Sequence, residues 1–274
     1  MILARAAAEK NIKIVAAESR NFLLKKIAPA VALQAMRQPF IIGFVCVMAT
    51  QIAVAEDLPA YRPALIGRSP GAIINRIDTN LLTKAGQKNA AVMFVAAVEE
   101  TGEVKWSGTY RGTPDSKLLE QEVQRVLTNA KMIQAIRNHK PVSVFYYGTV
   151  IFEVLEGKPR LRIFANQETN ELKNENDFIS PQPCLGGDSK FDGLHYPSTN
   201  DAPVAVSGAV ELALKIDEQG NLVSERVVSE SPPLLGLGQA AMNDFANAKF
   251  VPAFRNGQPV ACEITLPIYY QPKS

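Results

Sequence analysis

Apolar and polar residues alternate in the stretch GAVELALKI, which begins at Gly208. Alternation with a period of two predicts a strand with one buried face. An acidic turn with a glycine follows at 217–221, and a second extended stretch covers 222–228. The pattern therefore predicts a β-hairpin.

Helical periodicity is clearest in the middle of the chain. Leu119, Val123 and Val126 recur at the spacing of one helix face, with polar residues between them. A weaker helix is predicted around 237–246, and a final strand over 260–268. Apolar residues alternate along that strand and place Cys262 on its buried face.

The same order of elements is written twice. NAKMIQAIRNHKPV at 129–142 returns as NAKFVPAFRNGQPV at 247–260, a displacement of 118 positions. The register continues without a gap upstream, where Val92 matches Val210 and Gly102 matches Gly220. Two copies of one α+β domain are therefore expected, each a β-hairpin, a helix and a strand with a small antiparallel sheet.

The repeat and the composition together predict a domain layout. A connecting segment covers 56–87, and the first copy covers 88–166 and ends in an extra hairpin. A polar linker covers 167–195, and the second copy covers 196–274.

Residues 1–55 are interpreted as a leader that ends in a signal peptide. An apolar run follows Met36 and ends in Ala-Val-Ala, so cleavage is predicted between Ala55 and Glu56. Either translation begins at Met36 or the leader is unusually long. The alternative to cleavage is an anchor in the inner membrane, and only then would the protein contact a membrane. Export implies a periplasmic or secreted protein.

Charge and cysteine content narrow the function. The net charge is +2, and residues 1–55 carry seven Lys and Arg against two Asp and Glu. The remainder is therefore slightly acidic and lacks the dense basic face that nucleic acids require. In an oxidising compartment, Cys184 and Cys262 either form one disulfide or stay apart as an exposed and a buried thiol.

Catalytic and cofactor signatures are missing from the sequence. The only histidines are His139 and His195, no nucleophile motif of the G-x-S-x-G type occurs, and there is no Gly-rich phosphate loop. We expect neither an enzyme nor a metal or cofactor site. Trp106 is interpreted as a packing residue, whereas Tyr269 and Tyr270 either line a peptide groove or cap the core.

The second copy resembles the C-terminal domain of TonB-family energy transducers. The resemblance rests on a Gly-x-Val opening, an Asp-x-x-Gly turn, Phe-x-Pro-Ala, Asn-Gly-x-Pro-Val and a closing Leu-Pro-Ile strand. The residues are Gly208, Val210, Asp217, Gly220, Phe250, Pro252, Ala253, Asn256, Gly257, Pro259, Val260, Leu266, Pro267 and Ile268. The first copy is recognisable through the second, with Gln134 in place of the proline and His139 in place of the glycine.

The resemblance implies a protein-binding domain whose edge strand pairs with an extended peptide, such as a segment of an outer-membrane receptor. The candidate strand is Val260, Ala261, Cys262, Glu263, Ile264, Thr265 and Leu266. Two alternatives stay open: a membrane-anchored energy transducer acting in transport across the outer membrane, and a structural envelope protein whose domains pair or form a homodimer.

Overall fold

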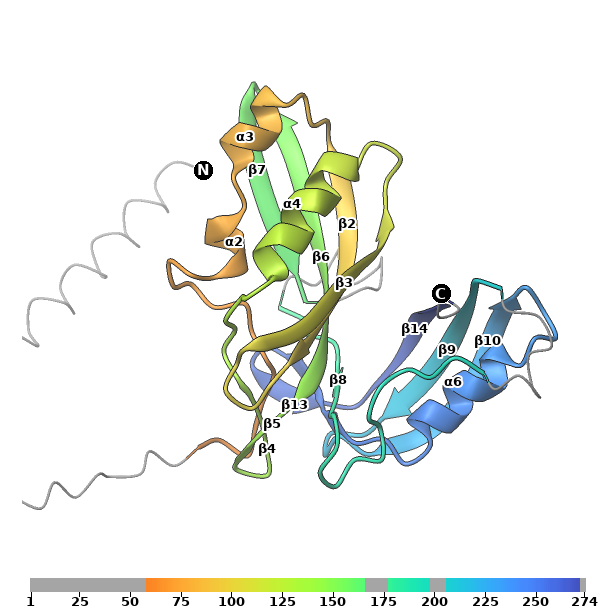
Figure 1. The fold of residues 1–274 in the computed structure, drawn as a ribbon. Helices are drawn as coiled ribbons and strands as arrows, with labels where there is room; N and C mark the ends of the chain where they lie inside the picture. The colour runs from red at the N-terminus through yellow and green to blue at the C-terminus, as the bar shows by residue number, and fades with distance from the viewer. Residues whose placement is uncertain (1–57, 166–176, 198–205, 272–274) are drawn as a thin grey trace, which may run out of the picture. The chain divides into compact units, whose positions relative to one another are not determined.

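The computed structural model describes residues 58–165, 177–197 and 206–271 (Figure 1). These residues belong to one unit that spans residues 55–274. The leader and the predicted cleavage site between Ala55 and Glu56 lie outside the described residues. In the described part of the chain, no helix is both long and apolar enough to span a membrane.

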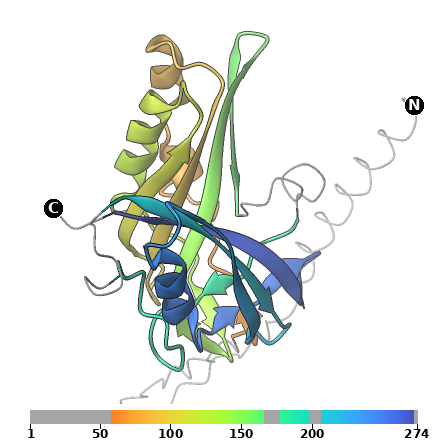
Figure 2. The same ribbon diagram turned by 90° about the vertical axis from the view of Figure 1, so that its right-hand side faces the viewer.

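The first sheet has four antiparallel strands in the order β3-β2-β6-β7. They are β2 (Ala90–Val98), β3 (Val104–Gly112), β6 (Val144–Leu155) and β7 (Lys158–Phe164). Helix α4 (Lys117–Leu127) covers one face, with Leu119, Val123 and Val126 fully buried against the sheet, which confirms the predicted amphipathic helix. The long hairpin of β6 and β7, in green at the top of Figure 2, is the predicted extra hairpin.

The connecting segment packs beside the first sheet. It holds β1 (Tyr61–Arg62), α2 (Ile73–Arg76) and α3 (Thr79–Lys84). β1 pairs with β4 (Ala135–Arg137), which also pairs with β5 (Lys140–Val142).

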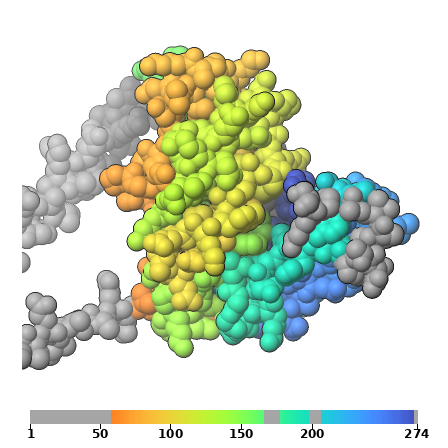
Figure 3. All heavy atoms as spheres, in the orientation of Figure 1, coloured from red at the N-terminus to blue at the C-terminus, as the bar shows by residue number. Residues whose placement is uncertain are grey.

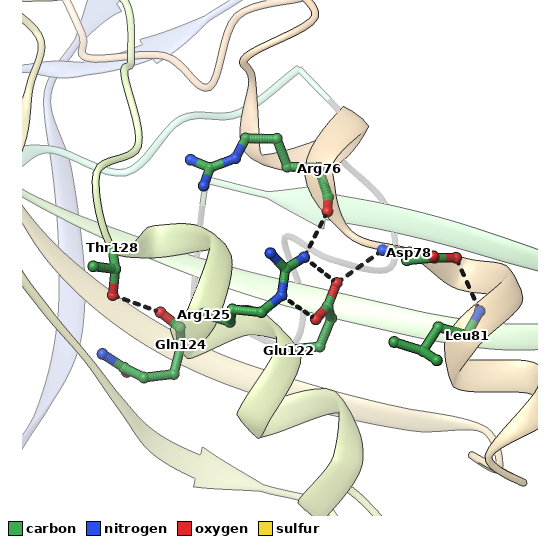
Figure 4. Close-up of polar contacts among 7 residues, drawn as sticks. All are labelled: Arg76, Asp78, Leu81, Glu122, Gln124, Arg125 and Thr128. Atoms are coloured by element: carbon green, nitrogen blue, oxygen red, sulfur yellow. Dashed lines mark hydrogen bonds and ion pairs between the residues drawn. The ribbon is translucent and has the colours of Figure 1, made fainter.

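A buried carboxylate joins α4 to the connecting segment (Figure 4). Arg125 donates to both oxygens of Glu122, at 2.6 and 2.7 Å, and the main-chain N–H of Asp78 donates to the same carboxylate at 2.9 Å. Arg125 also donates to the carbonyl of Arg76 at 3.1 Å. The hydrogen bonds from Arg125 hold the pKa of Glu122 below its usual value, although burial opposes this.

The second sheet has the strand order β10-β9-β14. Its strands are β9 (Gly208–Ile216), β10 (Leu222–Ser231) and β14 (Cys262–Tyr270), and α6 (Leu237–Phe245) packs against them. Three short strands lie between α6 and β14, namely β11 (Phe250–Val251), β12 (Ala253–Arg255) and β13 (Gln258–Val260).

The two sheets correspond at a displacement of 118 residues. β2 and β9, β4 and β12, and β5 and β13 coincide at both ends, whereas β6 and β14 coincide at their first residue. Gly102 and Gly220 both have positive φ, and a Cβ on either would collide with the carbonyl of Met132 or Phe250 respectively. The same two residues also donate a hydrogen bond to the glycines: the N–H of Met132 to the carbonyl of Gly102 at 2.7 Å, and the N–H of Phe250 to that of Gly220 at 2.8 Å. The same turn is therefore built twice.

The segment 177–197, here called the connector, packs between the two sheets (Figure 3, teal). Its strand β8 (Gln182–Pro183) pairs with β11, and the side-chain amide of Gln182 bonds both main-chain groups of Ala64, at 2.7 and 3.0 Å. Phe191 is fully buried, with its ring 5.4 Å from Phe145 of the first sheet and 4.7 Å from Phe245 of α6. This part of the predicted linker is therefore held against both sheets by the apolar residues that are scattered through its polar sequence.

Candidate functional site

Among the outermost strands of the described sheets, β14 makes the longest unbroken pairing with its neighbour. β14 pairs with β9 through nine consecutive residue pairs, from Cys262 with Ile216 to Tyr270 with Gly208, and the register has no irregularity. Among the strands that the structure describes, β14 is the last on its side of the sheet. A regular outermost strand presents a row of main-chain groups to which another strand can pair.

The other sheet edges carry features that discourage pairing. β3 and β10 each have two register shifts against their neighbours, and such bulges bend an edge and interrupt its ladder. β7 is regular but has the sequence KPRLRIF, with three cationic residues and a proline. Charges and prolines are common means of protecting an edge strand.

The predicted binding strand divides at Ala261. Val260 belongs to β13 and pairs with Ala253, whereas Cys262, Glu263, Ile264, Thr265 and Leu266 lie in β14. Ile264 and Leu266 are buried in the core of the second sheet. Glu263 is exposed and lies 3.4 Å from Arg226 of β10.

Pro267 indicates which main-chain groups of β14 face outward. The main-chain groups of successive residues in a strand point to opposite sides, and proline has no N–H to donate. Because pairing with β9 continues through Pro267, its nitrogen lies on the outer side of β14, together with the N–H groups of Glu263 and Tyr269. The first sheet agrees with this assignment: Ser143, which precedes β6 and corresponds to Ala261, has its carbonyl on the outer side, where it accepts a hydrogen bond from the N–H of Leu185 in the connector.

Of the two alternatives for the cysteines, the structure shows separate thiols, but with the expected burial reversed: Cys184 is buried and Cys262 is half-buried. Cys184 and Cys262 are both thiols. Cys184 lies in the core of the first sheet and bridges to Val144, whereas Cys262 pairs with Ile216 in the second sheet. The two residues are therefore held by different strands. Burial raises the pKa of Cys184 to about 12.

A groove lies beside the C-terminal half of β14. It has a volume of about 480 Å³ and combines strands of the first sheet with the end of β14. In Figure 3 the dark blue end of β14 lies beside the yellow residues of β3. Among the described residues none that lines the groove carries a charge; they are Val95, Trp106, Gly108, Thr109, Tyr110, Phe145, Tyr147, Leu194, Pro267, Ile268, Tyr269 and Gln271. We call this feature the aromatic groove.

One ring contact, between Tyr110 and Tyr269, joins the two walls of the aromatic groove, and two others lie within the wall from the first sheet. The ring of Tyr110 lies 5.5 Å from Tyr269 and 6.5 Å from Tyr147, and Trp106 lies 6.2 Å from Phe145. Trp106 is 54% exposed. Burial raises the pKa of Tyr110 and of Tyr147, so both hydroxyls are neutral.

The structure separates the two alternatives for the tyrosine pair. Tyr270 is buried in the core of the second sheet, whereas Tyr269 is 39% exposed and lines the aromatic groove. Trp106 also lines this groove and is not a core residue. A sequence signal for this aromatic face was available in Phe145 and Tyr147, which lie two positions apart on β6. The interpretation of Trp106 as a packing residue did not use it.

The two histidines lie apart, and each makes its own polar contact. Nδ1 of His139 lies 2.7 Å from the carbonyl of Leu58, and Nδ1 of His195 lies 2.9 Å from the Asp244 carboxylate. Among the residues placed in the structure, no three His, Cys, Asp or Glu side chains gather as a metal ligand set.

Residues 194–272 match the family model of the Gram-negative bacterial TonB protein C-terminal domain. No curated protein and no solved structure matches the chain. Domains of this family are non-catalytic, periplasmic or envelope-associated modules that interact with proteins such as outer-membrane receptors. The match therefore implies a TonB-like protein-interaction module that contains β9, β10, α6 and β14.

Proposed function

We propose that the chain is an exported, non-catalytic binding protein that recruits an extended segment of a partner protein onto the outer edge of β14. The observation that carries the proposal is the position of β14. It is a regular outermost strand within the residues that match a protein-interaction family. Strand addition uses main-chain hydrogen bonds for affinity and alternate side chains for selectivity.

In this proposal, residues 88–166 and 196–274 are two TonB C-terminal-like domains in tandem. Support comes from the shared strand order, the matching bounds at a displacement of 118 residues, and the paired turns at Gly102 and Gly220. The proposal also includes a partner in the cell envelope, such as an outer-membrane receptor, and export by cleavage before Glu56.

Photo-crosslinking in cell envelopes tests the proposed edge directly. Glu263, Lys215 and Ser224 lie in one row across the second sheet, so Glu263 and Ser224 are matched positions on its two outer strands. A photoreactive residue at Glu263 is expected to capture a partner protein, and one at Ser224 is expected to capture none. Equal capture at both positions, or no capture at Glu263, would contradict the proposal. Capture of only a second copy of this chain would instead indicate a structural homodimer.

A pair of substitutions at Glu263 separates main-chain pairing from side-chain contact. Glu263→Pro removes an outward N–H while leaving the ladder to β9 in place, so it is expected to abolish capture. Glu263→Ala removes the ion pair with Arg226, which is exposed and contributes about 0–1 kcal/mol, and is expected to preserve capture. Loss of capture in both variants would show recognition by the carboxylate rather than by strand addition.

The mass of the intact protein purified from its native envelope tests export. A mass for residues 56–274 is expected. A mass that retains the apolar run after Met36 would contradict cleavage and favour a membrane-anchored transducer.

A further inference from the structure

The aromatic groove is continuous with the outer edge of β14. Pro267, Ile268 and Tyr269 belong to β14 and also line the groove. The opposite wall comes from β2, β3 and β6 of the first sheet. An extended peptide that pairs with β14 and continues past Pro267 therefore runs into a groove that the other sheet helps to build.

The lining defines the chemistry of the occupant. The described residues of the lining supply aromatic rings and main-chain groups but no charged side chain, which favours an uncharged peptide segment. Trp106, which lines the groove, has more than half of its surface exposed. A second aromatic ring in the groove would bury that surface and stack at the offset or edge-to-face geometries that aromatic pairs prefer.

One of the groove residues also carries a buried polar group. Tyr147 lines the groove, and its hydroxyl is buried with no hydrogen-bond partner among the described residues. Buried hydroxyls in proteins are usually paired. Because the hydroxyl is closed to solvent, a peptide main chain would supply the missing hydrogen bond only once the Tyr147 side chain turned into the groove.

We propose that the aromatic groove is a side-chain pocket for the peptide bound on β14, and that it selects an aromatic or large aliphatic residue. This inference rests on the proposed strand addition at β14. It assigns the first sheet a role in recognition, because Trp106, Tyr110, Phe145 and Tyr147 all belong to that sheet. Selectivity would then come from a surface outside the residues that match the TonB family.

Peptide selection on the full chain tests the inference. A phage library of random 12-residue peptides is selected on the unsubstituted protein and on Trp106→Ala, Trp106→Phe, Glu263→Pro and Leu155→Ala. Leu155 is a matched control, because it is 47% exposed on β6 but does not line the groove. Circular dichroism and thermal melting establish that each variant is folded.

The unsubstituted protein is expected to select peptides with an aromatic or large aliphatic residue at a fixed position. Trp106→Ala should weaken the selected peptides by about three- to tenfold and remove that preference. Trp106→Phe should restore both, and Leu155→Ala should change neither. Trp106 is the only tryptophan, so its fluorescence reports occupancy. It should respond to a selected peptide and not to the same peptide with alanine at the preferred position.

The failures are distinguishable. Peptides that require an intact β14 edge, but are indifferent to Trp106→Ala and leave its fluorescence unchanged, would overturn the groove proposal and leave strand addition standing. Peptides that bind Glu263→Pro as well as the unsubstituted protein would overturn strand addition. If no peptide is selected on the unsubstituted protein, both proposals are wrong.

Discussion

Strands β6 and β14 occupy the same place in their two sheets, beside β2 and β9 respectively, but their outer edges differ. Along β6, residues from Thr149 to Leu155 pair with β7, and Val144 bridges to Cys184 of the connector. Along β14, no further strand of the described residues follows in the sheet order. In the first sheet, the place beside β6 is therefore taken by β7, which becomes the outer strand of that sheet.

This difference teaches how one arrangement of strands can serve two purposes. A sheet whose edge is filled by its own hairpin does not need a partner strand, so its exposed face can contribute side chains to a neighbouring surface. The first sheet presents Trp106 and Tyr110 beside β14 in this way. The second sheet keeps the outermost strand, and under our proposal it supplies the main-chain hydrogen bonds.

The largest expected effect comes from the turn that the two sheets share. Gly102→Ala and Gly220→Ala should each destabilise the protein by at least about 2 kcal/mol, since each puts a Cβ at positive φ against a main-chain carbonyl. Chemical denaturation measures the loss. Gly257→Ala is the control, because Gly257 also has positive φ but nothing lies within 4 Å of its added Cβ. If only one of the two glycines is sensitive, the two turns are not equivalent.

The next largest loss of stability is expected from a contact that only the first sheet has. Glu122 and Arg125 join α4 to the connecting segment, whereas Ala240 and Asn243 take their places in α6. Arg125→Ala should cost about 1–2 kcal/mol, because it leaves a buried carboxylate with fewer donors while the arginine itself is half-exposed. Asn243→Ala is the matched control and should cost less. Equal costs, measured by chemical denaturation, would contradict a special anchor in the first sheet.

The same anchor predicts a pH dependence. The folded protein holds the pKa of Glu122 below its unfolded value, so the stabilisation is complete above the unfolded value of about 4.3 and is lost as the pH falls below it. Melting temperatures should therefore decline more steeply below about pH 4.3 in the unsubstituted protein than in Glu122→Gln. Parallel declines would show that Glu122 titrates normally.

A smaller and opposite effect is expected in the aromatic groove. Tyr147→Phe removes a buried hydroxyl that has no hydrogen-bond partner among the described residues, so it should leave the free protein unchanged or stabilise it by up to about 1 kcal/mol. Tyr146→Phe on the opposite face of β6 is a useful comparison, because its ring is buried against Phe94. Destabilisation by Tyr147→Phe in thermal melting would show that the hydroxyl is already paired.

Local patterns predicted the elements of this fold well. Alternation at Val210, Leu212 and Leu214 indicated β9, and the helical spacing of Leu119 and Val123 indicated α4. Both signals arise within a few residues, where side-chain periodicity follows directly from backbone geometry. The predicted start of the last strand was less accurate. Apolar residues alternate from Val260 onward, but Val260 belongs to the β12–β13 hairpin, and β14 begins only after Ala261.

The aromatic groove could not be predicted in the same way. Its walls come from Trp106, Phe145 and Tyr269, which are far apart in sequence and meet only through tertiary packing. The cysteine pair illustrates the same limit, because compartment and number suggested a disulfide while the strands hold Cys184 and Cys262 in different cores.

Amide hydrogen exchange at two matched residues tests the central contrast most directly. Ile151 of β6 and Tyr269 of β14 correspond at the displacement of 118 residues, and both main-chain N–H groups are assigned to the outer side of their strands. Ile151 lies opposite Arg162 of β7. We expect the Ile151 amide to exchange at least about tenfold more slowly than that of Tyr269 in the free protein, since among the described residues only Ile151 has a further strand on its outer side. Equal protection of the two amides would contradict the claim that a further strand covers the outer side of β6 but not that of β14.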